Sequence, residues 1–293
     1  MTTLVDRLEW GLVPAVPVPF RGAELDEAAQ RSYARWMAAQ PVAGVAVWAH
    51  TGRGPHLSGE QRRVVLDAWR DALPDRVVVA GARDIGMAIE ARRGRADAIL
   101  VFPERTDPVG HHRRLSRELP VIAFYLYEAA GGVAYDDDTL EKILQLPGVI
   151  GIKVATLDSV MTFQRIAAVM SRHPDKLLLT GEDRFLGYSL LMGARAALIG
   201  MGAALPELQA ELLRARGEED WKRFVEISEL CDRFSQVTFI QPMEGYIRRM
   251  LWAAAAEGAL PSEATDDPWG PPLPGAERDA VERLVRDARA ARA

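Results

Sequence analysis

The sequence predicts an α/β protein: a closed (β/α)8 barrel (TIM barrel) with a C-terminal helical extension. Two observations support this. Eight short apolar runs recur along the first two thirds of the 293 residues, and most are followed by a segment with the periodicity of an amphipathic helix. The runs are almost continuously apolar, as expected for parallel strands covered on both faces.

The eight expected strands span residues 12–18, 42–48, 77–80, 98–101, 121–125, 149–154, 177–180 and 196–199. Eight β/α units over roughly 200–250 residues fit a closed barrel. An open doubly wound sheet is the alternative, and it usually carries a Gly-x-Gly-x-x-Gly turn after its first strand. The stretch VPVPFRGAELD stands there instead, so the barrel is favoured.

Helices are expected between these strands at 26–39, 58–72, 136–146, 159–172 and 184–192. Asp26 and Ser58 are suitable N-cap residues for the first two. After residue 199 the alternation stops, and further helices are expected at 205–216, 221–236, 244–257 and 277–291. We therefore expect a barrel over residues 1–204 and a helical extension over 205–293, packed on it as one structural unit.

Composition excludes several classes of protein. The net charge of −5 does not suggest a nucleic-acid partner. The single cysteine, Cys231, allows neither an intramolecular disulfide nor a cysteine-built metal site, and the histidines show no metal-ligand spacing. No signal peptide is evident at the start, and no apolar run reaches the roughly 18 residues that span a bilayer. A cytoplasmic protein without membrane or metal partners is expected.

Lysine is scarce in this chain, which makes Lys153 conspicuous. Of 36 basic residues only four are lysines: Lys142, Lys153, Lys176 and Lys222. Lys153 lies near the C-terminal end of the run 149–154, which faces the active-site mouth of a barrel. A buried lysine that loses its proton can form a Schiff base with a carbonyl, and arginine cannot. The alternative is a lysine that snorkels from the strand end or pairs with a carboxylate.

Two tyrosines lie near the end of the expected fifth strand, which neighbours the strand of Lys153. Tyr125 closes that strand, so a hydroxyl there is expected beside Lys153, where it can move protons during Schiff-base chemistry. Tyr127 is a competing candidate, two residues on and expected on the same strand face. The alternative for either is a core or interface tyrosine.

The loop HTGRG, after the second strand, is a candidate binding loop. Its glycines, Gly52 and Gly54, permit a tight turn whose backbone N–H groups can hold a carboxylate. Thr51 adds a hydroxyl donor, and His50 adds a titratable group at the barrel mouth. An ordinary connecting loop is the alternative.

The motif TGED follows the seventh strand. Gly181 permits close backbone approach, while Glu182 and Asp183 can bind substrate hydroxyls or an amine. Helix N-capping by either carboxylate is the alternative, and as a single explanation it is favoured.

Together these motifs resemble the dihydrodipicolinate synthase / N-acetylneuraminate lyase family of Schiff-base aldolases, along nearly the whole chain. The similar segments are GLVPAVPVPF, HTGRGPHLSGEQRRVV, FYLYEAAGGV, GVIGIKVA, TGED and ALIGM. The resemblance puts the Schiff-base role on Lys153 and the proton-shuttling role on Tyr125, and it places Gly181 and Ile199 at the substrate pocket. It implies a homo-oligomer (tetramer or dimer), enamine chemistry on pyruvate or another 2-oxo acid, and no metal or organic cofactor.

The sequence also departs from the family pattern. His50 stands where the family often has the first threonine of a pair, and Arg53 replaces the glutamate of that loop. Ala130 replaces the arginine that dihydrodipicolinate synthase uses for its second substrate's carboxylate, and the aromatic pair by which neighbouring subunits complete the proton relay is missing. We therefore expect a Schiff-base aldolase or lyase other than dihydrodipicolinate synthase. A dehydratase of a deoxy 2-oxo sugar acid, using the same iminium chemistry, and a non-catalytic binding or regulatory barrel are the alternatives.

Overall fold

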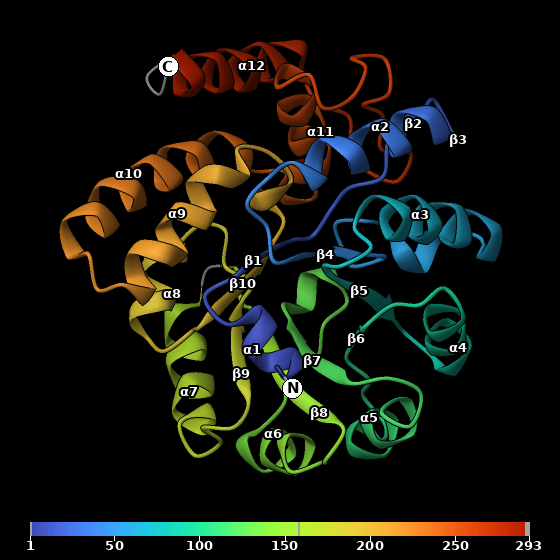
Figure 1. Cartoon of the computed structure of the whole chain (residues 1–293), viewed down its shortest axis with the longest axis vertical. Coiled ribbons are helices and arrows are strands. Elements are labelled where there is room, and N and C mark those ends of the chain that lie inside the picture. The colour runs from blue at the N-terminus through green and yellow to red at the C-terminus, as the bar shows by residue number, and fades with distance from the viewer. Residues whose placement is uncertain (1, 158, 291–293) are drawn as a thin grey trace.

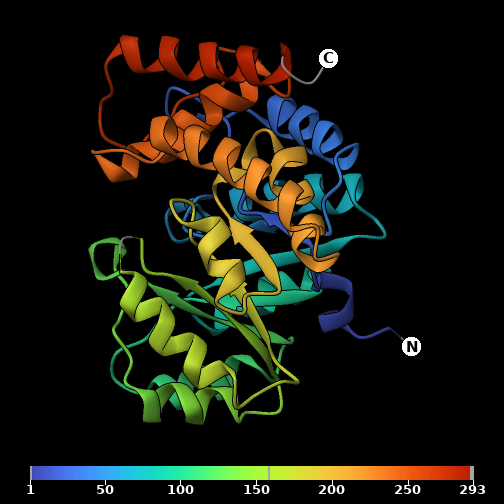
Figure 2. The ribbon, with the colours of Figure 1, turned by 90° about the vertical axis from the view of Figure 1, so that its left-hand side faces the viewer.

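The computed structural model describes residues 2–157 and 159–290, and in them eight parallel strands form a barrel (Figures 1 and 2). The strands run in the order β1-β10-β9-β8-β7-β6-β5-β4. A parallel bridge between Ala15, just after β1, and Ala46 of β4 joins the two ends of this order. The strands are β1 (Leu12–Pro14), β4 (Gly44–Val47), β5 (Val77–Ala82), β6 (Ala98–Val101), β7 (Val121–Leu126), β8 (Val149–Ala155), β9 (Leu177–Thr180) and β10 (Ala196–Ile199). The predicted barrel is confirmed, and each expected run overlaps a strand.

Helices surround the barrel in Figure 1, apart from the first, whose Leu4, Val5 and Leu8 pack against the apolar interior. They are α1 (Leu4–Leu8), α2 (Glu27–Ala38), α3 (Gly59–Ala72), α4 (Ile85–Arg93), α5 (Pro108–Leu115), α6 (Asp137–Leu144), α7 (Val160–Met170), α8 (Leu186–Leu191) and α9 (Pro206–Gly217). Asp26 and Ser58 cap α2 and α3 as expected. The sequence did not predict α1, α4 or α5, which are short and offer few apolar repeats. A small antiparallel ribbon, β2 (Phe20–Arg21) with β3 (Glu24–Leu25), follows β1.

The C-terminal helices gather at one end of the molecule, shown at the top of Figure 1. They are α10 (Trp221–Thr238), α11 (Tyr246–Ala256) and α12 (Gly275–Ala290). The helix expected from residue 244 starts at Tyr246, and the end of the expected helix 277–291, residue 291, lies outside the described residues. The division of the chain at residues 204 and 205 stays a prediction. Within the described ranges, none of the helices has the length and apolarity needed to cross a membrane.

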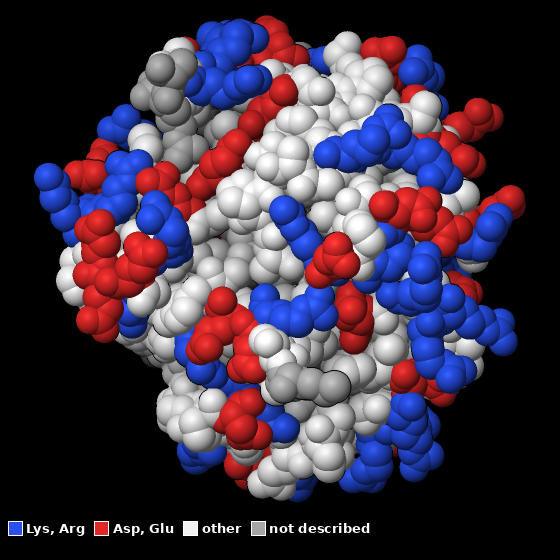
Figure 3. All heavy atoms as spheres, viewed as in Figure 1, with Lys and Arg blue, Asp and Glu red and all other residues white. Residues whose placement is uncertain are grey.

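Alternate residues of each strand enter two separate apolar clusters. One fills the barrel interior and includes Ala46, Leu100 and Phe124. The other lies between the strands and the surrounding helices and includes Ile152 and Tyr125. This alternation decides which strand residues can face a pocket at the barrel mouth. On the outside, basic and acidic side chains lie intermixed over the face shown in Figure 3.

Candidate active site

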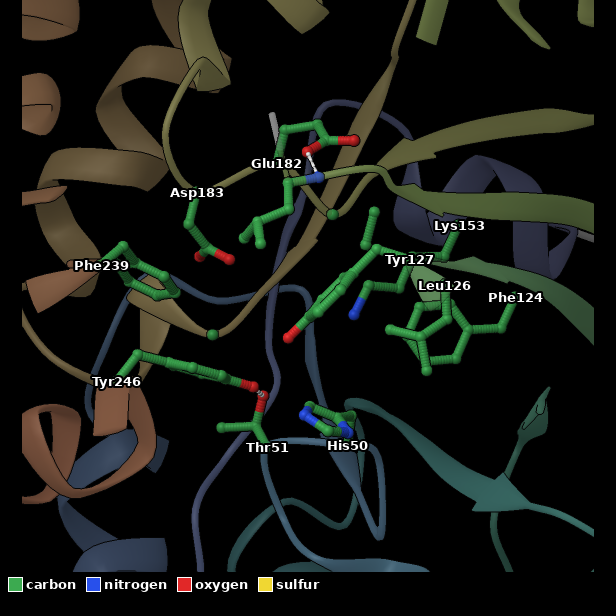
Figure 4. Close-up of a pocket in the computed structure, with 14 residues that line it drawn as sticks. His50, Thr51, Phe124, Leu126, Tyr127, Lys153, Glu182, Asp183, Phe239 and Tyr246 are labelled. Atoms are coloured by element: carbon green, nitrogen blue, oxygen red, sulfur yellow. Dashed lines mark hydrogen bonds between the residues drawn. The ribbon is translucent and has the colours of Figure 1, made fainter. Parts of the chain in front are cut away.

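A pocket opens at the C-terminal ends of the strands and encloses roughly 430 Å³ of empty space, part of it open to solvent (Figure 4). The barrel contributes side chains from β7 and β8 and from the loops that follow β4, β7, β8 and β9. The extension adds Phe239 and Tyr246. The polar ends of Lys153, Tyr127, Thr51 and Asp183 converge on one space in Figure 4.

Lys153 lies inside this pocket and is 5% exposed. It belongs to β8, and its strand position points it into the barrel, between the outward-facing Ile152 and Val154. Its Nζ lies 4.4 Å from the centre of the Phe124 ring. Burial lowers the pKa of the Lys153 amine to about 8, although the nearby Asp183 and Glu182 carboxylates act to raise it. The neutral, nucleophilic form is therefore far more accessible than in an exposed lysine.

Two carboxylates of the loop after β9 flank this lysine. Asp183 accepts a hydrogen bond from the backbone N–H of Met201 at 2.7 Å, and burial raises the pKa of its carboxyl. Glu182 accepts from the backbone and hydroxyl of Thr156 at 2.6 and 2.9 Å, and burial raises the pKa of Glu182 to about 7. Neither caps a helix, because α8 begins at Leu186 with no side-chain cap. The N-capping alternative is therefore wrong.

Glu244 links three groups at the rim of the pocket. The Tyr127 hydroxyl donates to its Oε1 at 3.0 Å, His50 Nε2 lies 2.9 Å from the same oxygen, and Arg53 Nη1 donates to Oε2 at 2.9 Å. Burial acts to raise the pKa of Glu244, but the hydrogen bond and charge of His50, with the Arg53 charge and the Tyr127 bond, hold it at about 2. Glu244 is thus a permanently ionised carboxylate with three hydrogen-bond donors.

Arg53 is itself held in place by Asp267. Its Nη2 and Nε donate to the two carboxylate oxygens of Asp267 at 2.7 and 3.1 Å. Arg53 is 6% exposed and Asp267 only 2%. A bidentate pair of this kind fixes the guanidinium plane, and with it the oxygen of Glu244 that Arg53 contacts.

A neutral pair of hydroxyls lies beside His50 (Figure 4). Thr51 Oγ1 lies 2.9 Å from the Tyr246 hydroxyl oxygen, and the Tyr246 ring stacks on Phe239 with centroids 4.8 Å apart. Burial raises the pKa of Tyr246 well above its ordinary value, so both hydroxyls keep their protons. The site thus combines an accessible amine, two buried carboxyls, one fixed carboxylate and a pair of hydroxyls.

Comparisons with known proteins agree with this architecture. No family model matches the chain. A 4-hydroxy-tetrahydrodipicolinate synthase of Anaplasma marginale (strain Florida) is 28% identical over 248 residues, covering 79% of this chain and 81% of that protein. The N-acetylneuraminate lyase from Mycoplasma synoviae superposes with a TM-score of 0.78 at 21% identity, covering 97% of this chain and 98% of that one. A dihydrodipicolinic acid synthase family protein from E. coli K12, solved in complex with pyruvate, gives 0.83 at 20% identity, with 95% and 98% covered.

These similarities support a divergent member of the dihydrodipicolinate synthase / N-acetylneuraminate lyase family. Of the seven site residues that the sequence favoured, four line the pocket: Lys153, Thr51, His50 and Gly181. The further candidates Tyr127, Glu182 and Asp183 line it as well. Gly181 lies so close to Lys153 that a Cβ on it would meet the lysine Cε at 2.6 Å. The structure therefore brings these four residues together, from three different strand ends.

Tyr125 is not among them, and its expected position beside Lys153 is corrected. It lies in the cluster between strands and helices, and its register partner on β8 is the outward-facing Val154. Tyr127 lines the pocket instead. Regular alternation would place both tyrosines on one face, but β7 ends at Leu126, so Tyr127 lies in the turn beyond it and escapes that alternation. The β7 residue in register with Lys153 is Phe124, which also lines the pocket.

Ile199 and Gly52 also lie away from the pocket wall. Ile199 faces outward from β10, and Gly200, the next residue, lines the pocket instead. Gly52 serves the turn itself, because a Cβ there would lie 2.9 Å from the carbonyl oxygen of Val16. Both residues shape the strand ends without facing the empty space.

Sequence patterns did not indicate Phe239, Glu244 or Tyr246, which lie at the end of α10, in the turn before α11 and at the start of α11. They lie about 190 residues from the loop they contact, and 244–257 was expected to be one helix. A 3₁₀ turn over Met243–Gly245 precedes α11 and turns Glu244 toward the barrel mouth. The only local signal was the pair of helix breakers Pro242 and Gly245.

Proposed function

We propose that this chain is a class I aldolase or lyase that forms a Schiff base between Lys153 and pyruvate or another 2-oxo acid. The observation that carries the proposal is the buried Lys153 amine, whose pKa is lowered to about 8, at the mouth of a barrel shared with this family. A lysine desolvated in this way is an activated nucleophile for carbonyl carbons.

In the proposed reaction the neutral Lys153 amine attacks the keto carbon, a C–N bond forms, and water leaves to give an iminium ion. Asp183 and Glu182 lie near enough to stabilise that positive charge, since both act to raise the pKa of Lys153. Loss of a proton or cleavage of a C–C bond next to the iminium carbon then gives an enamine. The groups that act in these steps, Lys153, Asp183 and Glu182, are all side chains of this protein.

The substrate carboxylate is proposed to bind at the turn after β4. Within residues 2–157 and 159–290, no partner accepts a hydrogen bond from the backbone N–H of His50 or Thr51. The Thr51 hydroxyl, held by Tyr246 at 2.9 Å, lies beside them. Two unpaired N–H groups and a hydroxyl form a suitable anion site, and Gly52 allows the turn that presents them.

Borohydride trapping tests the proposal. Incubation with pyruvate and borohydride should leave a covalent adduct, read by intact mass and mapped by peptide digestion to Lys153. Lys153→Arg should remove the adduct, while the control Lys142→Arg, on helix α6, should keep it. Absence of any adduct across a panel of 2-oxo acids would refute the function. Full biological function in Lys153→Arg would instead support a non-catalytic binding barrel.

We further propose that the reaction is not dihydrodipicolinate synthesis. Ala130 stands at the position of that enzyme's arginine, and the guanidinium of Arg53, at the pocket rim, is already engaged by Asp267 and Glu244. A second substrate with a carboxylate therefore lacks an obvious cationic partner. Product analysis separates an aldolase from a dehydratase, since both trap on Lys153. A homo-oligomer (dimer or tetramer), a small-molecule substrate and independence from cofactors remain predictions.

A further inference from the structure

His50 and Glu244 form a pair that the Schiff-base chemistry of Lys153 does not require. His50 lines the pocket, and its Nε2 lies 2.9 and 3.1 Å from the two oxygens of Glu244. Glu244 is held in turn by Arg53 and by the Tyr127 hydroxyl. The carboxylate therefore cannot rotate without losing several charge-assisted hydrogen bonds.

This geometry defines the tautomer of the imidazole. A carboxylate that is ionised accepts only, so the neutral His50 ring carries its proton on Nε2. Nδ1 is then left as an acceptor, and none of the described side chains forms a hydrogen bond with it. A carboxylate that orients a histidine in this way also stabilises the imidazolium formed when the other nitrogen takes a proton.

Tyr127 is a poorer end point for such a proton. Its hydroxyl hydrogen points to Glu244, so accepting a substrate proton requires passing its own proton to that carboxylate. Glu244 has a pKa of about 2, which makes it a weak base. Burial and the Glu244 charge also raise the pKa of Tyr127, so the phenolate is disfavoured. Of the three groups that contact Glu244, His50 is therefore the one with a second nitrogen, Nδ1, left to accept a proton.

We propose that His50 is the acid–base group for the hydroxyl on C4 of a 4-hydroxy-2-oxo acid substrate, and that Glu244 positions it. The proposal rests on the proposed function, because it acts on a substrate already held as an iminium on Lys153. Tyr127 serves as a third anchor of Glu244.

In the cleavage direction, Nδ1 of His50 accepts the proton of the C4 hydroxyl. The C3–C4 bond breaks, its electron pair forms the C2–C3 double bond of the enamine, and the iminium nitrogen becomes neutral. C4 leaves as an aldehyde carbonyl. The imidazolium then gives its proton to C3 of the enamine, which restores both neutral His50 and the iminium, ready for hydrolysis. Condensation runs through the same steps in reverse.

The test separates Schiff-base formation from turnover. The probe reaction is aldol addition of pyruvate to glycolaldehyde, a neutral hydroxyaldehyde, and the second readout is the borohydride-trapping rate with pyruvate alone. His50→Gln should lower kcat by roughly 10²–10⁴-fold, the usual contribution of general acid–base catalysis. Glu244→Gln should lower kcat by at least about tenfold with little change in KM, as for loss of a group that acts in the transition state. Trapping should stay within about threefold of wild type in both, since neither residue attacks the keto carbon.

Glu141, a residue outside the pocket, provides a matched control. Glu141 accepts from His173 Nε2 at 2.9 Å and from Arg172 at 2.9 Å, which repeats the carboxylate–histidine–arginine arrangement on α6, away from the pocket. Glu141→Gln should leave kcat and trapping unchanged. Thermal unfolding of each variant shows whether it folds.

Imidazole ¹⁵N NMR supplies a readout that needs no turnover. Wild-type His50, assigned from the His50→Gln spectrum, should show a protonated Nε2 and an unprotonated Nδ1, and Glu244→Gln should mix the tautomers. A proton on Nδ1 in the wild type would overturn the proposal. So would unchanged turnover in His50→Gln, an equal loss of trapping and turnover, or a wild type that traps pyruvate and processes no hydroxy-2-oxo acid. Failure of trapping in the wild type would instead refute the proposed function.

Discussion

Gly181→Ala tests how closely the loop after β9 fits against Lys153. An added Cβ would lie 2.6 Å from Lys153 Cε, 2.9 Å from the carbonyl oxygen of Val154 and 3.0 Å from Ala155 Cβ. Carbon atoms in contact stay about 3.5–4.0 Å apart, so Cε has to move by about 1 Å. The other two neighbours belong to β8 itself, so the strain cannot be relieved by the lysine alone.

The expected loss has two parts. A misplacement of about 1 Å at a reacting group can cost on the order of 10²-fold in rate. Overpacking of a filled interior typically costs about 1–3 kcal/mol in the free energy of unfolding. We therefore expect Gly181→Ala to slow adduct formation with pyruvate about 100-fold, while the protein still folds.

The assay is the rate of borohydride-trapped adduct formation with pyruvate, followed by intact mass, together with a urea unfolding curve. Gly275→Ala is the matched control, because a Cβ on Gly275 meets no atom within 4 Å. A trapping rate in Gly181→Ala that stays within about threefold of wild type would show that the lysine position tolerates a shift of this size, against the reasoning above.

Four further outcomes are expected. The trapping rate should rise with pH up to about 8, where the Lys153 amine loses its proton. The pKa of Lys153 in the folded protein lies below the ordinary 10.5, so between about pH 8 and pH 10.5 the unfolded chain binds more protons than the folded one. Lys153 therefore makes the free energy of unfolding rise with pH over this range. Urea unfolding at each pH measures the effect. Tyr127→Phe should reduce kcat at least about tenfold while Tyr125→Phe leaves it unchanged, and the reverse order would restore the original assignment. Asp267→Asn should lower the free energy of unfolding by about 3–5 kcal/mol, since it leaves the buried Arg53 without its bidentate partner; a loss below about 1 kcal/mol in a urea titration would contradict this.

The barrel was predictable because its signal is repeated and local. Each strand is a short apolar run between turn residues, and eight such runs in order leave few arrangements. Lys153 was predictable for the same reason, since its place within a strand follows from the run around it. The alternation of strand residues between the barrel interior and the surrounding helices then decides which neighbours of Lys153 share its pocket.

The prediction was wrong where regular geometry ends. Tyr127 lies one residue beyond β7, so the alternation that holds inside the strand no longer applies to it. Gly200 continues the alternation of β10, in which Leu198 faces the interior and Ile199 faces outward, and there the side of the strand was misjudged. Boundaries of this kind are not resolved by a pattern of apolar residues. Glu244 and Tyr246 were out of reach for a different reason, because their contacts with the β4 loop join segments about 190 residues apart and leave no periodic trace in the sequence.

The turn that carries Glu244 is held from both sides, which gives the rim of the pocket a rigidity independent of the barrel strands. On the barrel side Arg53 contacts Glu244 and is fixed by Asp267. On the other side Arg249, fully buried, donates to the carbonyl oxygens of Ile240 and Pro242 and pairs with Glu277 of α12. A substitution in the extension can therefore move a charge at the pocket rim without disturbing the strand that holds Lys153. The proposed nucleophile and the proposed acid–base pair are thus supported by separate parts of the chain, so we expect a change in the extension to alter turnover while borohydride trapping on Lys153 is kept.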